Sequence, residues 1–336
     1  MRTFVTGATG FVGAHAARRL AEAGHELHCL VRKTSKVEHL KDLGATLVEG
    51  DVSDRDSLMR GMQGCDWVAN LANVYSFWER DRRIFRRVNV DGTLNVMECA
   101  LQAGAAKVLH VSSAVVFGKP TVSPFTEEVP VGPSRFSEYA RTKYEGDLIA
   151  WDLSKKRGLP LVVVYPAAIL GTGDNKATGQ YMANLVNRRL PIRMLDDSVM
   201  TYVHVGDVAD AIVRVLEKEN NTGEKYLLGS EQLSMREISG MVCEIAGVPL
   251  PRMSLPDVLV PLNATLFTLL ANLTKSPPAW GMSTDMVSTV KEGFRFDGSK
   301  AARELGIIYT PVRKAVEEAI AASRARPVPK ASRGVV

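Results

Sequence analysis

A glycine-rich segment near the N-terminus constrains the fold more than any other feature of the sequence. Residues 2–5 form an apolar run typical of a strand, which leads into Thr6-Gly7-Ala8-Thr9-Gly10-Phe11-Val12-Gly13. The apolar spacing of a helix begins at once. Gly7 permits a tight turn, Gly10 lets the backbone approach a pyrophosphate, and Gly13 lets the helix pack close to the strand. The N-terminus of that helix offers free N–H groups to phosphates.

We therefore expect this segment to bind a dinucleotide, with a glycine turn that holds no ligand as the alternative. The predicted contacts come from Gly7, Thr9, Gly10, Phe11 and Val12.

The first half of the chain alternates strand and helix patterns. The predicted strands are 2–5, 26–31, 46–50, 67–71, 107–111 and 161–165, and helical patterns between them include 90–103 and 139–156. Short apolar strands that alternate with helices favour a parallel sheet covered on both faces. Because crossovers are right-handed, the expected fold class is α/β, a Rossmann-type doubly wound sheet.

The second half loses this rhythm. We assign residues 1–165 to a dinucleotide-binding domain, and we expect residues 195–220 to return to it through a strand at 201–205 and a helix at 207–216. Residues 166–194 and 221–323 are expected to form a smaller, mostly helical substrate-binding subdomain. Residues 324–336 are expected to be a flexible tail.

Two apolar groups in that subdomain have two interpretations. The first comprises Met182, Leu185 and Val186, and the second is the stretch from Leu255 to Leu273. Both are interpreted first as ordinary core. The alternative is a lipid-like pocket, and for the longer stretch also a weak contact with a membrane surface.

Composition excludes several classes of protein. The chain of 336 residues is 24% charged with a net charge of +5, and its arginine-rich segment at 82–87 has no accompanying nucleic-acid motif. Its four cysteines are far apart, and no His or Cys cluster has metal-ligand spacing, so we expect reduced thiols, no metal site and a cytoplasmic location. No signal peptide is expected before a strand that begins at residue 2, and no apolar run is long enough for a membrane span.

Two basic residues, Arg32 and Lys33, follow the second predicted strand. In a dinucleotide fold this position meets the adenosine ribose, where an acidic residue would repel a 2′-phosphate. Basic residues would neutralise that phosphate, and Arg can bind it through two hydrogen bonds. The sequence therefore favours NADP(H) over NAD(H), and an exposed basic loop is the alternative.

Two further strand ends are predicted to line the cofactor. Asp51 can accept a hydrogen bond from the adenine amino group while Val52 packs on the ring, although Asp51 could instead cap the next helix, as could Ser53 or Asp54. After the fourth strand, small residues would leave room for the central part of the cofactor, and the expected contacts are Leu71, Ala72 and Asn73.

Tyr139 and Lys143 are the candidates for proton transfer. Their i, i+4 spacing places both on one face of a helix. A nearby ammonium is expected to lower the pKa of the phenol, so that Tyr139 acts as general acid or base. Lys143 could also bind the nicotinamide ribose. Ser113, at the carboxyl end of the fifth strand, is expected to hold the substrate oxygen, with Ser112 in a supporting position.

Together these segments resemble the extended short-chain dehydrogenase/reductase family, within the NAD-dependent epimerase/dehydratase superfamily. The matching pieces are TGATGFVG at 6–13, GDV at 50–52, NVDGTLNV at 89–96, VSSAVVFG at 111–118, YARTK at 139–143 and YVHVGDV at 202–208. They span about two-thirds of the chain in the family's order. The closer resemblance is to the branch of dihydroflavonol-reductase-like proteins, 3β-hydroxysteroid-dehydrogenase-like proteins and the hopanoid-associated sugar epimerases.

The resemblance implies hydride transfer between nicotinamide and a carbonyl or secondary alcohol, cofactor contacts from Pro166, Ala168 and Ile169, and a homodimer paired through the helices at 90–103 and 139–156. Members that act on nucleotide sugars usually carry arginines where this chain has Tyr165 and Met200. Tyr75, Phe77 and Trp78 are expected to contact an apolar or ring-containing substrate. We therefore expect an NADP(H)-dependent oxidoreductase for a small or lipid-like molecule. The alternatives are a sugar epimerase or dehydratase that recycles a bound cofactor, and a non-catalytic cofactor sensor.

Overall fold

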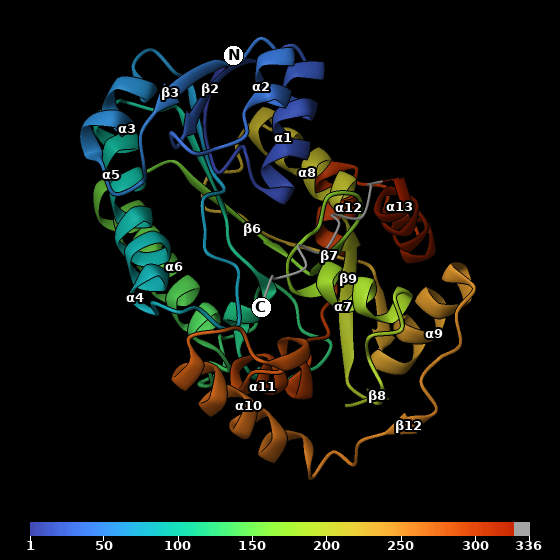
Figure 1. Cartoon of the computed structure of the whole chain (residues 1–336). Coiled ribbons are helices and arrows are strands. Elements are labelled where there is room, and N and C mark those ends of the chain that lie inside the picture. The colour runs from blue at the N-terminus through green and yellow to red at the C-terminus, as the bar shows by residue number, and fades with distance from the viewer. Residues whose placement is uncertain (326–336) are drawn as a thin grey trace, which may run out of the picture.

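The structure, a computed structural model, describes residues 1–325 and is built around a seven-stranded sheet (Figure 1). All neighbouring strands in this sheet are parallel, in the order β10-β6-β5-β4-β1-β2-β3. The strands are β1 (Arg2–Thr6), β2 (Glu26–Val31), β3 (Thr46–Glu49), β4 (Trp67–Asn70), β5 (Lys107–Val111), β6 (Leu161–Pro166) and β10 (Lys225–Leu228). The order turns back at β1, which is the arrangement predicted for a doubly wound sheet.

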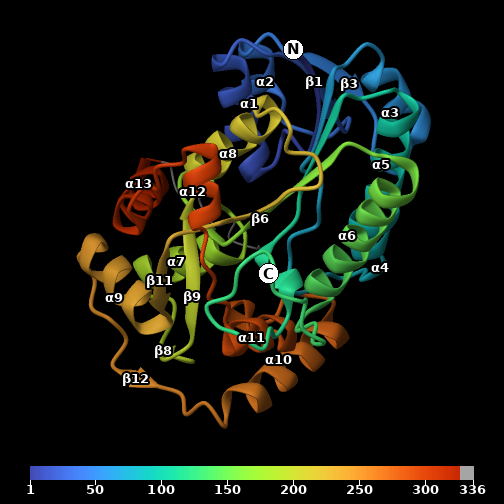
Figure 2. The same cartoon turned by 180° about the vertical axis from the view of Figure 1, so that it is seen from behind.

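Helices cover both faces of this sheet, which explains why the central strands are almost uniformly apolar. α1 (Phe11–Glu22) packs beside α8 (Val205–Glu217) on one face. α3 (Arg55–Met62), α5 (Thr93–Gln102) and α6 (Glu138–Arg157) cover the other face, as Figures 1 and 2 show from opposite sides. Every residue of β6 is buried as a result.

Local sequence signals set the limits of α6, which carries two of the predicted functional residues. The Ser137 hydroxyl accepts a hydrogen bond from the Ala140 N–H at 3.1 Å and so caps the first turn. The helix ends at Gly158, whose φ of 72° is the left-handed conformation that glycine adopts without strain. The chain before α5 is a π-helical segment, Arg86–Gly92, which continues directly into α5.

The expected return of residues 195–220 to the main sheet is wrong for its strand. β9 (Val199–His204) lies in a separate three-stranded sheet with β7 (Ala168–Leu170) and β11 (Glu231–Ser234), and β10 takes the edge position beside β6. The separation begins at Pro166, the last residue of β6. Because proline has no N–H to donate to the ladder, the chain leaves the main sheet there and β7 begins two residues later.

The region after β10 is mainly helical, as predicted. It contains α9 (Met235–Ala246), β12 (Met253–Ser254), α10 (Val260–Thr274), α11 (Thr284–Glu292), α12 (Ser299–Leu305) and α13 (Val312–Ala325). The earlier elements not yet given are α2 (Glu38–Asp42), α4 (Arg83–Phe85), α7 (Ala177–Val186) and β8 (Ile192–Arg193). Met182 and Leu185 are buried in the core between α7, α9 and α13, in keeping with the first interpretation of that group. α13 includes residues 324 and 325 of the predicted tail, and residues 326–336 lie outside the described residues.

The close approach of α1 to the end of β1 depends on two glycines. A Cβ atom at Gly13 would lie 2.0 Å from the carbonyl oxygen of Gly7, and one at Gly7 would lie 2.7 Å from the amide nitrogen of Ala72. Gly7 also has a φ of +74°. Both contacts are with backbone atoms, which cannot move aside as a flexible side chain can.

We expect Gly13→Ala to destabilise the fold by about 3 kcal/mol, because the new methyl group forces α1 away from β1. The measurement is urea unfolding followed by circular dichroism. Gly240→Ala in α9 is the matched control, since no atom lies within 4 Å of its added Cβ. Its helical position predicts a gain of about 0.5–1 kcal/mol. Equal stability of the two variants would contradict the packing argument.

Candidate active site

The glycine turn presents an open helix end at the carboxyl edge of the sheet. Gly10 precedes α1, no side chain caps this end, and the first turn has no acidic residue. The N–H groups there are available to an anion. A loop after β7 lies beside the same turn, since the Thr172 carbonyl is 2.9 Å from Nε2 of His15. Thr9, Phe11 and Val12 lie at this end, and the predicted contacts Ala168 and Ile169 belong to β7.

The residues predicted to bind the adenosine half lie at the ends of β2 and β3. Arg32 and Lys33 are exposed directly after β2. Asp51 does not cap α3, because that role belongs to Asp54, whose carboxylate accepts from the N–H groups of Asp56 and Ser57. An Asp51 carboxylate oxygen accepts instead from the Ser53 N–H at 3.0 Å and from its hydroxyl at 2.7 Å.

The remaining cofactor candidates lie at the ends of neighbouring strands. Val52 is buried and would contact a Cβ at Gly92. Leu71 is buried after β4, while Asn73 is exposed and its side-chain amide donates to the Leu71 carbonyl at 3.1 Å. Pro166 is the buried last residue of β6. These positions form a continuous series along the carboxyl edge of the sheet, where ligands of such folds bind.

Ser113, Tyr139 and Lys143 come together where β5 ends against α6. Tyr139 and Lys143 are buried on the same side of the helix. The Lys143 ammonium donates to the carbonyl of Val111, the last residue of β5, at 2.8 Å. The Ser113 hydroxyl forms a hydrogen bond that lowers the pKa of the Tyr139 phenol, and it also accepts from the Val115 N–H at 3.5 Å.

Burial dominates the acid–base properties of this group. It raises the pKa of Tyr139 well above the usual value for a phenol, and the neighbouring Tyr75 raises it further. Burial also lowers the pKa of Lys143 to about 8, although the Asp147 carboxylate opposes that shift. Lys143 is not among the groups that shift the pKa of Tyr139 in this structure, where its ammonium is hydrogen-bonded to the Val111 carbonyl, so the expected lowering of that pKa by Lys143 stays a prediction.

A buried line of polar side chains runs beneath these residues from β1 to α6. The Thr6 hydroxyl donates to Oδ1 of Asn70 at 2.7 Å, and the Asn70 amide nitrogen lies 3.1 Å from Nδ1 of His110. Nε2 of His110 lies 3.3 Å from an Asp147 oxygen, and the Ser112 hydroxyl donates to the other at 2.8 Å. Because the Asn70 amide can only donate to Nδ1, a neutral His110 carries its proton on Nε2, facing Asp147.

Tyr75 and Phe77 form an aromatic group with Tyr139. Tyr75 contacts Tyr139 edge to face with ring centroids 5.1 Å apart, and Phe77 contacts Tyr75 in the same way at 5.8 Å. Trp78 extends away from them, since its indole N–H donates to Oδ1 of Asn272 in α10 at 3.0 Å. Two of the three predicted substrate residues therefore lie together beside Tyr139.

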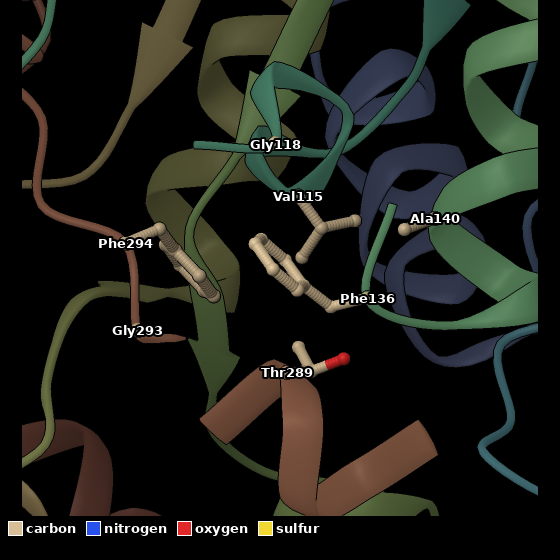
Figure 3. Close-up of a pocket in the computed structure, with 7 residues that line it drawn as sticks. All are labelled: Val115, Gly118, Phe136, Ala140, Thr289, Gly293 and Phe294. Carbon is tan, nitrogen blue, oxygen red and sulfur yellow. The ribbon is translucent and has the colours of Figure 1, made fainter. Parts of the chain in front are cut away.

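A small apolar pocket lies next to this group (Figure 3). Its walls include Ala140, which follows Tyr139, and Val115, whose N–H contacts Ser113. Figure 3 shows the rings of Phe136 and Phe294 pointing toward each other, with Thr289 of α11 beside them. Residues from three distant parts of the chain form it, which is why sequence spacing does not identify it.

The two positions at which nucleotide-sugar enzymes usually carry arginine are apolar or buried. Tyr165 is buried in the main sheet, and its hydroxyl accepts from the Trp151 indole N–H at 3.3 Å. Met200 lies in β9, bridged to Phe294. Neither position offers a cation to a diphosphate.

Comparison with known proteins identifies the family to which this site belongs. The model of the NAD-dependent epimerase/dehydratase family matches residues 3–229. This chain belongs to that family. It is an oxidoreductase of the extended short-chain dehydrogenase/reductase type, and the predicted resemblance is confirmed.

Among curated relatives of this family member, sterol demethylase protein B of Methylococcus capsulatus is 31% identical over 97% of this chain and 99% of its own. A 4-hydroxy-2-methyl-3-oxo-4-farnesyl-3,4-dihydroquinoline-1-oxide ketoreductase of Stigmatella aurantiaca is 27% identical over 74% of each chain. UDP-glucose 4-epimerase of Corynebacterium glutamicum is 26% identical over 90% of this chain and 99% of its own. The solved structure of gox2253 has a TM-score of 0.83 at 34% identity, covering 96% of this chain and 97% of its own.

Sequence reasoning missed the polar line beneath the catalytic candidates. Asn70, His110 and Asp147 are almost fully buried, and none was predicted to take part in the site. Two signals were available. Asn70 and His110 are polar residues inside otherwise apolar strands, and Asp147 follows Lys143 at the i+4 spacing that places the two side chains together.

Two further observations concern residues 1–325. No group of three or more His, Cys, Asp or Glu side chains in this range is arranged to hold a metal ion, and its four cysteines are buried and unpaired. None of the helices in this range is both long enough and apolar enough to cross a membrane.

We expect Asp147→Asn to move the alkaline limb of the pH–activity profile to lower pH. The Asp147 carboxylate raises the pKa of Lys143, so its loss lets the ammonium deprotonate at a pH below about 8. The measurement is the initial rate of cofactor turnover against pH. Asp152→Asn is the matched control, because Asp152 is exposed on the same helix and paired with Lys156. An unchanged alkaline limb in Asp147→Asn would show that the carboxylate has no effect on Lys143.

Proposed function

We propose that the protein is an NADP(H)-dependent reductase for a ketone or aldehyde group on a small or lipid-like molecule. The observation that carries this proposal is the convergence of Ser113, Tyr139 and Lys143 beside aromatic side chains, with no arginine at the two usual diphosphate positions. Glycine turn, strand ends and Lys143 would hold the dinucleotide along the carboxyl edge of the sheet.

The protonation state of Tyr139 suits reduction. Because burial keeps the phenol protonated at neutral pH, Tyr139 can donate a proton to an oxygen that gains negative charge. Ser113 orients the carbonyl oxygen toward Tyr139, and Lys143 holds the nicotinamide ribose. NADPH, when bound, would supply the hydride for the carbonyl carbon. The proton from Tyr139 then completes the alcohol, and the phenolate regains its proton from solvent.

The substrate class follows from the lining of the site. Tyr75 and Phe77 place aromatic rings next to Tyr139, and such rings bind apolar or ring-containing molecules. The names of two relatives, a sterol demethylase protein and a ketoreductase for a farnesylated quinoline, agree with such a substrate. A sugar epimerase or dehydratase remains the second candidate, favoured by the family name and by the UDP-glucose 4-epimerase relative.

The preference for NADP(H) rests on Arg32 and Lys33. Both side chains are exposed at the end of β2, where a 2′-phosphate on the adenosine ribose would lie. A homodimer paired through α5 and α6, and a cytoplasmic location, stay predictions from the family resemblance.

The first test is a panel of carbonyl compounds incubated with the protein and NADPH, followed by absorbance of the reduced cofactor. We expect oxidation over many turnovers with ring-containing or lipid-like ketones. Tyr139→Phe should lower the rate by at least about 100-fold, because the proton donor is lost while the ring remains. Tyr144→Phe, one residue beyond Lys143, is the matched control.

The alternatives give different results in the same assay. If no carbonyl compound causes NADPH oxidation, and a nucleotide sugar gives product without net change in the cofactor, the protein is an epimerase or dehydratase. If neither carbonyl compounds nor nucleotide sugars are converted while the cofactor still binds, the protein is a sensor. Full activity of Tyr139→Phe would overturn the role assigned to the phenol.

The second test concerns the cofactor phosphate. We expect NADPH to bind more tightly than NADH, and Arg32→Ala to weaken NADPH binding by roughly 10- to 100-fold, since a charge-assisted hydrogen bond is lost. NADH binding should stay unchanged. Calorimetric titration measures both affinities. Arg60→Ala, which removes an exposed charge from the last turn of α3, is the control. Equal binding of the two cofactors by the unaltered protein would refute the NADP(H) assignment.

A further inference from the structure

The apolar stretch that sequence reasoning interpreted mainly as core contains a ridge of exposed leucines. The side chains that form this leucine ridge lie on α10 and just before it, and between 42% and 81% of each is exposed: Val258, Leu259, Leu262, Leu266, Leu269, Leu270 and Leu273. Their spacing of three and four residues places them along one side of the helix. The opposite side, with Val260 and Ala264, packs into a small core with α11.

The helix that carries the leucine ridge has no charged residue. From 258 to 274 the sequence contains no Asp, Glu, Lys or Arg. A helix that pairs with another helix usually carries charges beside its apolar seam, which select the partner. Here the ridge is also broader than a paired seam, because Val258 and Leu270 extend it to either side. These features fit the surface of a lipid bilayer better than a second helix.

Five polar side chains of α10 each have a hydrogen-bond partner within the protein. Asn263, Thr265, Thr268 and Thr274 each donate to the backbone carbonyl four residues earlier, at 2.7–2.9 Å. Asn272 accepts from the Trp78 indole at 3.0 Å. Removing water from a polar group costs less free energy when the group already has a hydrogen-bond partner. These hydrogen bonds lower the cost of removing water from the surface of α10.

The ridge continues onto Trp280, an exposed aromatic held in an unfavourable conformation. Trp280 is 44% exposed and has a φ of 52°, a value that bulky residues rarely adopt. Its ring contacts Phe267 of α10 edge to face, with centroids 5.9 Å apart. Indole rings are enriched where apolar and aqueous regions of a bilayer meet.

Residues 79–87, which extend the arginine-rich segment by three residues, lie beside α10 and α11 and have five arginines and two acidic residues. Arg82, Arg83 and Arg86 form ion pairs with carboxylates of the protein, whereas Arg80 and Arg87 are exposed, form none within residues 1–325 and would attract anionic headgroups. Arg82 lies 3.5 Å from Asp285 of α11. Just before the segment, the Trp78 indole donates to Asn272 of α10, and the Phe77 carbonyl accepts from the hydroxyl of Ser283, which caps α11, at 2.9 Å. Figures 1 and 2 both show α10 at one end of the molecule, away from the main sheet.

We propose that the leucine ridge of α10 binds the surface of an anionic lipid bilayer, with the arginine-rich segment at 79–87 contacting the headgroups. The helix would lie in the plane of the interface, with its leucines toward the acyl chains and its inner side on α11. The segment from Tyr75 to Trp78 connects this surface to Tyr139, so a lipid-like substrate could pass from the bilayer toward the site. The docking itself does not depend on the proposed reaction.

The test is sedimentation of the full chain with vesicles of phosphatidylcholine, with and without phosphatidylglycerol, in low and high salt. We expect binding to the anionic vesicles that weakens in high salt, because both apolar burial and headgroup attraction contribute. The double variant Leu262→Glu with Leu269→Glu should bind at least about tenfold more weakly. Ile308→Glu, which alters a 91% exposed isoleucine outside the ridge, is the matched control and should bind as the unaltered protein does.

Three outcomes would overturn the proposal. One is failure of the unaltered protein to sediment with anionic vesicles. Another is equal binding by the double variant and the unaltered protein. The third is light scattering in which the double variant dissociates an oligomer while no vesicle binding occurs, because the ridge would then pair with a second copy. Since no substrate or cofactor is present, these results are separate from the outcome of the carbonyl assay.

Discussion

The buried Asp147 carboxylate fixes the position of α6, and through it the chemistry of the site. An ionised side chain that is 4% exposed is tolerated only where hydrogen bonds and opposite charge replace water. Here the hydroxyl of Ser112, which directly follows β5, donates to one carboxylate oxygen, and Nε2 of His110 in β5 lies 3.3 Å from the other. Lys143 lies one turn earlier on the same helix. These contacts hold α6 against β5 in one register. Tyr139 consequently lies beside Ser113 rather than elsewhere along the sheet.

The same network connects the two ends of the cofactor site. His110 is hydrogen-bonded to Asn70 in β4, and Asn70 is hydrogen-bonded to Thr6, the residue before the glycine turn. The Thr6 hydroxyl also accepts from the Ala72 N–H at 3.1 Å, at the position where Gly7 approaches the chain most closely. Three neighbouring strands are thus joined by side chains as well as by their ladders. The glycine turn and the region of Tyr139 are thus linked through neighbouring buried polar side chains.

Much of this arrangement could be predicted because local patterns determine it. The limits of β2 and β5 match the predicted segments, and the other four strands differ by one residue at one end. The pairing of β9 could not be predicted in this way, because an apolar run indicates a strand but not its neighbour. The predicted triad of Ser113, Tyr139 and Lys143 does converge, yet its pKa values depend on burial. Tyr75 and Asp147, which only the folded chain places against the triad, shift these pKa values further by their charges.

The orientation of α10 shows how the size of apolar residues can carry information that hydrophobicity alone does not. Its inward positions include Ala264 and Ala271, seven residues apart, whereas the leucines lie outward. A helix that buries its large side chains gains the most from leaving water, so the reverse order is unfavourable for an isolated chain. Small residues on the inner face let α10 pack against α11 and leave the leucines exposed. The sequence already contained this pattern, but it became interpretable only once the inner face was known.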